Sequence, residues 1–76
     1  NPTKGKLNIQ LSKPANDVSI KVYDVLGREV IHIEKAQFQN NKLELDLNDY
    51  ALERQIYLVE VTADNFSQDF KIIKNN

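Results

Sequence analysis

The sequence of 76 residues contains no cysteine, no methionine and no tryptophan, and it has only two glycines, two prolines and one histidine. Without cysteine the chain can form neither a disulfide nor a thiolate metal site, and one histidine cannot build a His-rich metal site. A chain this short has room for one domain and buries only about 60% of the surface that its unfolded form exposes. Its stability must come from apolar packing, at roughly 25 cal/mol per Å² buried.

An excess of charge of one sign is also missing, since 10 Lys and Arg stand against 11 Asp and Glu. These charges are scattered along the chain, which argues against a nucleic-acid partner and against an anionic membrane surface. No apolar run approaches the ~20 residues of a transmembrane helix. No segment has the basic and then apolar pattern of a signal peptide. We therefore expect no nucleic-acid binding and no direct membrane insertion.

Apolar and polar residues alternate with a period of two along most of the chain, which is typical of half-buried strands. Ile56–Val61 is a denser apolar run and predicts a central strand buried on both faces. With this run, the sequence has six strand-like runs, which are separated by short polar segments and lie at residues 7–11, 18–22, 30–33, 43–47, 56–61 and 68–73. The pattern predicts an all-β fold, an antiparallel sandwich of about six to seven short strands.

Two tight turns are predicted from residue type. Gly27 lies between two alternating runs and predicts a hairpin in which glycine takes a positive φ, so that residues 18–22 pair with 30–33. Arg28 is then interpreted as a solvated turn residue. Asp64–Asn65 predicts a two-residue hairpin, because both residue types tolerate positive φ.

The candidates for chemistry are few. His32 lies between two isoleucines in a strand, so its side chain should point away from theirs, and no partner for general-base catalysis stands at motif spacing. Three carboxylates lack the spacing and the loop glycine of a calcium site, and they are interpreted as part of a solvated face: Glu44, Asp46 and Asp49. The triplet at 65–67 matches a glycosylation pattern but is interpreted as turn chemistry. We predict no enzyme activity, no catalytic residue, no metal site and no cofactor.

Five short motifs follow one another along the whole chain: NPTKG at 1–5, IKVYDVLGREV at 20–30, LDL at 45–47, IYLVEV at 56–61 and KIIK at 71–74. In this order the chain resembles the type IX (Por) secretion system C-terminal sorting domain of secreted Bacteroidetes proteins. The resemblance implies that the fold is an immunoglobulin-like β-sandwich. It also implies that residues 1–76 form a single C-terminal sorting domain, which is excised from a larger secreted cargo protein. It further implies that the domain directs a cargo attached at its N-terminus through the periplasm and outer membrane to the cell surface or extracellular space.

The partners implied by the resemblance are the type IX outer-membrane translocon and a sortase-like peptidase that commonly removes the domain during cell-surface attachment. A signal read by another protein needs exposed features, and the last strand could offer an open edge to a partner strand. The residues suggested for translocon recognition are Gly27, Lys71, Ile72, Ile73 and Lys74. The two lysines could equally act as gatekeepers against aggregation, and Gly27, like Gly5, is first of all a turn residue.

One position departs from the family pattern, because Gln55 stands where a glycine usually precedes the aromatic strand. A glutamine there would resist a positive φ that glycine accepts. An alternative from another class is an immunoglobulin- or fibronectin-like accessory module that binds carbohydrate or protein. The KIIK ending and the scarcity of aromatic residues favour the sorting domain.

Overall fold

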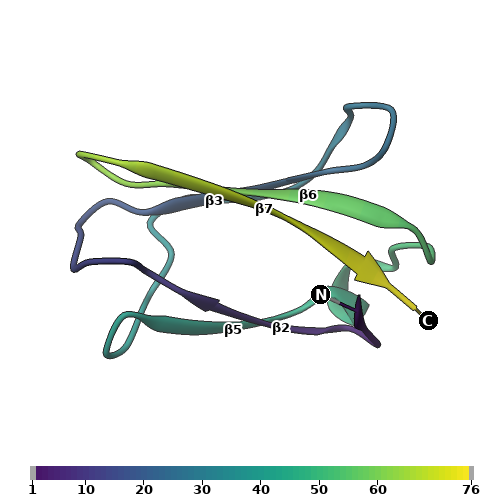
Figure 1. Cartoon of the computed structure of the whole chain (residues 1–76), viewed down its shortest axis with the longest axis horizontal. Helices are drawn as coiled ribbons and strands as arrows, with labels where there is room; N and C mark the ends of the chain where they lie inside the picture. The colour runs from purple at the N-terminus through teal and green to yellow at the C-terminus, as the bar shows by residue number, and fades with distance from the viewer. Residues whose placement is uncertain (1, 76) are drawn as a thin grey trace.

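The computed structural model describes residues 2–75, which form seven strands and one short 3-10 helix (Figure 1). In chain order the elements are β1 (Pro2–Thr3), β2 (Lys6–Gln10), β3 (Ser19–Tyr23), β4 (Glu29–Ile33), β5 (Lys42–Asp46), η1 (Leu47–Tyr50), β6 (Ile56–Thr62) and β7 (Ser67–Lys74). Within residues 2–75 no helix has the length and apolar character needed to cross a membrane.

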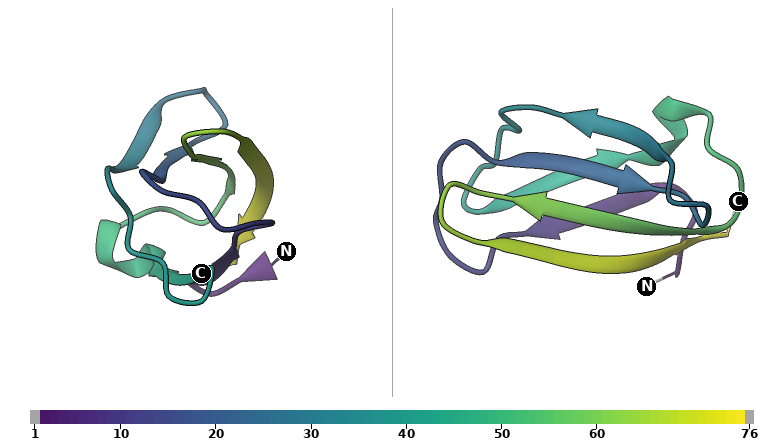
Figure 2. Two further views of the ribbon diagram at one scale, coloured as in Figure 1. Left: turned by 90° about the vertical axis from the view of Figure 1, so that its left-hand side faces the viewer. Right: turned by 90° about the horizontal axis from the view of Figure 1, so that it is seen from above.

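The strands form two sheets that face each other (Figures 1 and 2). One sheet has the order β1-β7-β6-β3-β4, and the other pairs β2 with β5. All neighbours are antiparallel except β1, which runs parallel to β7. The predicted all-β sandwich is thus confirmed. The succession β3-β6-β7 in one sheet and the pair β2-β5 in the other follow the C-F-G and B-E strand sets of immunoglobulin domains.

The core lies between the two sheets and consists mainly of the inward-facing residues of both, together with Leu47 of η1. The fully buried side chains are Ile9, Ile20, Val22, Leu47, Tyr57, Val59, Val61 and Ile72, each less than 2% exposed. The hydroxyl of Tyr57 donates a hydrogen bond of 2.6 Å to the carbonyl oxygen of Glu53. A tyrosine at the start of the F strand that bonds back to the preceding corner is a feature of immunoglobulin-like sandwiches. This hydrogen bond gives the hydroxyl group of Tyr57, the only polar atom of its side chain, a partner inside the core.

The prediction that Ile56–Val61 is buried on both faces is wrong. β6 lies in the middle of its sheet, and Tyr57, Val59 and Val61 are buried, but Ile56 is 46% and Leu58 37% exposed. The reason is that the two-stranded sheet covers one face of the larger sheet, and no third layer among the described residues covers the other (Figure 2).

Several turns use left-handed residues other than those predicted. Asn40 and Asn41 have φ of 54° and 64°, and Gln39 and Lys42 exchange two backbone hydrogen bonds around them, which is a two-residue hairpin of the primed type. The hairpin at 64–65 is confirmed by the bond from the Ala63 N–H to the Phe66 carbonyl, 2.8 Å. Its predicted positive φ is wrong, because neither central residue is left-handed.

The region around Gln55 is accommodated without glycine. Gln55 is not among the residues with positive φ, and the left-handed residue of this segment is Ala51, with φ 53° and ψ 41°, at the end of η1. The carbonyl of Gln55 accepts a hydrogen bond of 2.9 Å from the N–H of Lys74. The family's usual glycine is therefore not required by the backbone of this chain.

Candidate functional site

The β3–β4 hairpin is built around Gly27. The N–H of Gly27 donates to the carbonyl of Asp24 at 3.0 Å, and the N–H of Asp24 donates to the carbonyl of Arg28 at 3.0 Å. Gly27 has φ 81°, in the region that glycine adopts without strain. Beyond the turn, Ile20 pairs with Ile33 and residue 22 with residue 31, after a bulge next to Tyr23. The predicted hairpin is confirmed.

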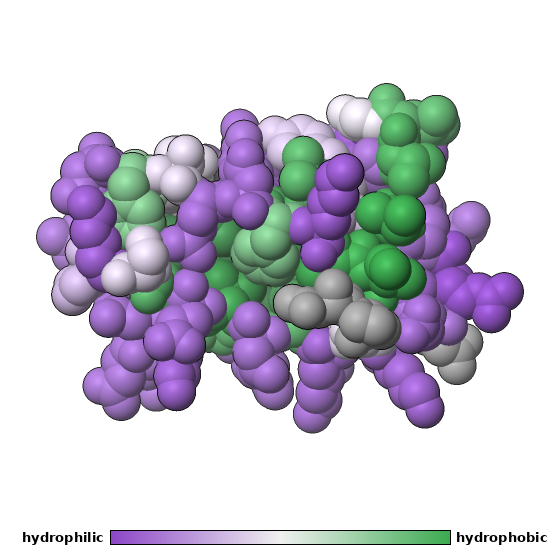
Figure 3. All heavy atoms as spheres, viewed as in Figure 1, coloured by the Kyte–Doolittle hydropathy of each residue, from purple (hydrophilic) through white to green (hydrophobic). Residues whose placement is uncertain are grey.

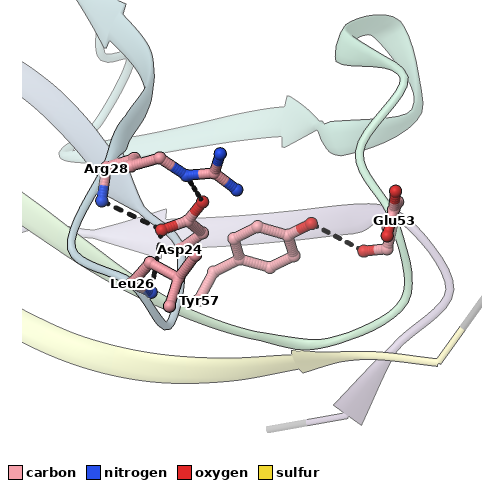
Figure 4. Close-up of polar contacts among 5 residues, drawn as sticks. All are labelled: Asp24, Leu26, Arg28, Glu53 and Tyr57. Atoms are coloured by element: carbon pink, nitrogen blue, oxygen red, sulfur yellow. Dashed lines mark hydrogen bonds and ion pairs between the residues drawn. The ribbon is translucent and has the colours of Figure 1, made fainter.

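Asp24 holds this turn together. Its Oδ1 accepts hydrogen bonds from the N–H groups of Leu26 (3.0 Å) and Arg28 (2.9 Å), and its Oδ2 lies 2.7 Å from Nε of Arg28 (Figure 4). The Asp24 side chain is 3% exposed, whereas that of Arg28 is 71% exposed. Arg28 is therefore not simply solvated, because it pairs with a buried carboxylate. The sequence signal for Asp24 was its place at the first position of a turn that ends in glycine.

These contacts set the ionisation of Asp24. The backbone N–H of Arg28, helped by its guanidinium and by the N–H of Leu26, lowers the pKa of the Asp24 carboxyl from its ordinary value of 3.8, although burial acts in the opposite direction. A carboxyl with a depressed pKa stabilises the folded state above its unfolded pKa, and this contribution is lost as the pH falls through the folded value.

We expect the unfolding free energy to fall on acidification below about pH 4, with Asp24 as one contributor. Replacing Asp24 with asparagine should lower stability at neutral pH and make the loss below pH 4 shallower, because the variant has no carboxylate to protonate here. Urea denaturation at neutral pH and at a series of acidic pH values measures both effects. The exposed Glu44→Gln variant is the control, and an Asp24→Asn profile parallel to that of the parent would contradict the assignment.

Gly27→Val should destabilise the domain by about 1–2 kcal/mol, since a β-branched residue resists a positive φ. The strain comes from the backbone alone, because a Cβ built at Gly27 meets nothing within 4 Å. Gly27→Asn should therefore cost clearly less, as asparagine tolerates the left-handed region. Thermal unfolding of both variants tests this, and equal losses would mean that something other than φ is at work.

The hairpin tip and the outer face of the larger sheet share an apolar patch, defined here as Val25, Leu26, Ile56, Leu58 and Ile73. Their exposures are 66%, 75%, 46%, 37% and 43%. Ile56 pairs with Ile73 across β6 and β7, and Leu58 pairs with Lys71, so these side chains point to the same outer face. An open groove lined by Asp24, Val25, Ile56, Leu58 and Lys71 connects the hairpin with this face. Figure 3 shows hydrophobic side chains gathered toward the right-hand end of the molecule, the end to which the β7 arrow points in Figure 1.

The structure separates the residues suggested for recognition into two groups. Lys71 and Ile73 point outward and lie in or beside the apolar patch, next to the hairpin that carries Gly27. Ile72 and Lys74 point inward and are 0% and 4% exposed. The two lysines of KIIK thus lie on opposite faces of β7, and they do not form one exposed charge pattern. The sequence pattern does not single out Val25, Leu26, Ile56 and Leu58 for recognition, because they lie in the predicted Gly27 hairpin and in the predicted central strand.

The other candidate side chains have local partners. His32 is exposed while Ile31 is buried, as predicted, and its Nε2 lies 2.6 Å from Oε1 of Glu34. The carboxylate of Asp46 accepts a hydrogen bond of 3.0 Å from the N–H of Asn48 and so caps η1. Within residues 2–75 no three His, Cys, Asp or Glu side chains are grouped so that they could hold a metal ion.

The family profile described as "secretion system C-terminal sorting domain" matches residues 1–75, which is nearly the whole chain. The chain belongs to this family. A search of curated proteins gave no match. The sorting domain is the C-terminal secretion signal of the type IX system, which exports proteins through the outer membrane to the cell surface or the extracellular space. The type IX assignment made from the five sequence motifs is thereby confirmed.

Proposed function

We propose that this sorting domain acts without catalysis, as a folded label at the C-terminus of a larger cargo that is attached before residue 1. The translocon reads the label through the apolar patch together with Lys71 and the Gly27 hairpin. A sortase-like peptidase then removes the domain when the cargo is attached at the cell surface. Ile72 and Lys74 contribute to recognition indirectly, by holding β7 in place from the inside.

The exposure of five large apolar side chains on one small domain carries this proposal. Contiguous exposed apolar groups on a soluble domain mark an interaction surface, because leaving them in water costs free energy that burial against a partner recovers. The backbone that carries these side chains is fixed by hydrogen bonds. Ile56, Leu58 and Ile73 lie on paired strands, and Val25 and Leu26 lie in the turn that the Asp24 carboxylate closes by accepting hydrogen bonds from the N–H groups of Leu26 and Arg28.

An export assay tests the proposal. Residues 1–76 are fused to the C-terminus of a periplasmic reporter in a type IX-competent bacterium, with a deletion of residues 71–76 as the negative control. We expect export of the parent fusion and retention in the periplasm when Leu58 is replaced with aspartate. Thr62→Asp is the matched control, because Thr62 is exposed on the same strand and pairs with Ser67, away from the patch.

The result is informative only if the variants fold, so the thermal midpoint of each isolated domain is measured in parallel. Export of Leu58→Asp at the parent's level would overturn the role of the patch. Retention of the parent fusion would overturn the function of residues 1–76 as a sufficient signal. Specific binding of a glycan by the isolated domain, with no export, would favour the accessory-module alternative.

A further inference from the structure

One edge of the larger sheet is half covered. β6 pairs with β7 over its whole length. The pairing runs from Ile56 opposite Ile73 at one end to Thr62 opposite Ser67 at the other. On the other side of β7, β1 pairs with Ile73 and Lys74 alone. No other strand among residues 2–75 pairs with β7 on that side, so residues 67–72 form an open edge. Such an edge is a template for another strand.

The direction of the backbone groups along this edge follows from two hydrogen bonds. The N–H of Lys74 donates toward the β6 side, to Gln55, and the N–H of Asn75 donates toward the β1 side, to Thr3. Because backbone groups alternate in direction along a strand, the N–H and carbonyl groups of Lys71 and Asp69 also point to the β1 side. These two residues are therefore the ones that an added strand would bond.

The same two residues carry opposite charges that lack compensation within the sheet. Asp69 is exposed, and its neighbour across β6 is Glu60, a like charge. Lys71 is exposed, and its neighbour across β6 is Leu58. Neither Asp69 nor Lys71 takes part in the ion pairs found within residues 2–75. Between them lies Phe70, which is half-buried against the core.

We propose that a second copy of this chain covers the open edge, with the two β7 strands antiparallel and a two-fold axis at Phe70. Asp69 then lies opposite Lys71 of the second copy, and Lys71 opposite Asp69 of the second copy. Each of these pairs exchanges both backbone hydrogen bonds, and the two Phe70 side chains meet as a non-hydrogen-bonded pair. The interface is self-complementary, as a two-fold dimer requires.

Charge and space select this register over its neighbours. Moving the axis to residue 69 or 71 places two aspartates or two lysines opposite each other. Moving it to a point between two residues places each residue whose N–H and carbonyl point outward opposite one whose groups point toward β6, so the backbone hydrogen bonds cannot form. With the axis at Phe70 the ladder runs from Gln68 to Ile72, and it stops where β1 already occupies the edge. We expect weak association that declines with salt, since the two ion pairs are exposed. This proposal is independent of the export function.

Sedimentation velocity of the chain over residues 1–76 tests the dimer, at concentrations from about 10 µM to about 1 mM, which cover weak association. Asp69→Lys and Lys71→Asp each convert both unlike pairs into like pairs, and each should weaken self-association by about tenfold or more. An equimolar mixture of the two variants restores both unlike pairs, so it should form a heterodimer. Glu44→Lys, an exposed change on β5, is the matched control and should associate like the parent.

A cysteine variant reports the register itself, in a chain that otherwise has no cysteine. In a non-hydrogen-bonded antiparallel pair the Cα atoms are about 4.5 Å apart, which a disulfide can span. Phe70→Cys should therefore form covalent dimers on mild oxidation, and Ser67→Cys, which does not face itself, should not. A parent chain that stays monomeric over the whole range, or charge variants that associate as the parent does, would overturn the proposal. Equal cross-linking of the two cysteine variants would overturn the register.

Discussion

Replacement of Gly5 with valine should remove a large part of the domain's free energy of unfolding, because two separate costs meet at this position. Gly5 lies between β1 and β2 with φ 148°, a conformation that side-chain-bearing residues rarely adopt. A Cβ there would lie 2.2 Å from Nδ2 and 2.7 Å from Cγ of Asn48. Backbone strain costs about 1–3 kcal/mol, and displacing the exposed Asn48 side chain from its hydrogen bond to the Lys4 carbonyl costs about 0.5–1.5 kcal/mol more. A chain of this length is stable by roughly 4–11 kcal/mol in total.

The two costs at Gly5 can be separated by a double-mutant cycle. Asn48→Ala removes the clashing amide, together with its hydrogen bond of 3.3 Å to the Lys4 carbonyl. Gly5→Ala in the Asn48→Ala background should cost less than Gly5→Ala alone, and the remaining loss is the backbone term. Urea denaturation of the four chains gives the coupling free energy. Strictly additive losses would show that Asn48 does not limit the space at Gly5.

The surroundings of Gly5 show which features of this fold can be predicted from the sequence and which cannot. The NPTKG motif indicated a change of chain direction at glycine, and the chain bends at Lys4 and Gly5. The contact with Asn48 depends on how η1 docks beside the β1–β2 connection, which no local pattern encodes. The same holds for β1, since two residues that include a proline carry no recognisable strand pattern. Local alternation predicted the five-residue strands well, because burial on one face follows directly from the period of two.

The failures in the candidate site share a physical cause. Alternation says which residues of a strand lie on the same face, but it does not say whether a second layer covers that face. Ile56–Val61 is apolar on both faces, and from composition alone a doubly buried strand is the natural prediction. The sheet lacks a layer on its outer side, so Ile56 and Leu58 become part of an exposed patch. An apolar residue at an uncovered position is thus the signal for a binding surface, and it becomes visible once the layers are known.

The KIIK segment gives the sharpest test of this division between fold and recognition. Ile72 is fully buried opposite Tyr57, whereas its neighbour Ile73 is 43% exposed opposite Ile56. Ile72→Ala should destabilise the domain by about 2–5 kcal/mol, because it leaves a cavity in a small core. Ile73→Ala should change the unfolding free energy by no more than about 1 kcal/mol, as is usual at the surface.

If the apolar patch is what the translocon reads, the two variants lose export for different reasons. Ile73→Ala then lowers export of a reporter fusion while its thermal midpoint stays near that of the parent. Ile72→Ala lowers both together, and its export recovers at lower temperature, where more of the domain is folded. Denaturation and export measured on the same two variants therefore distinguish contact from support. If Ile73→Ala is exported normally while Ile72→Ala fails even when folded, the machinery reads β7 from a side that the folded sandwich conceals, and recognition must then involve opening of this strand.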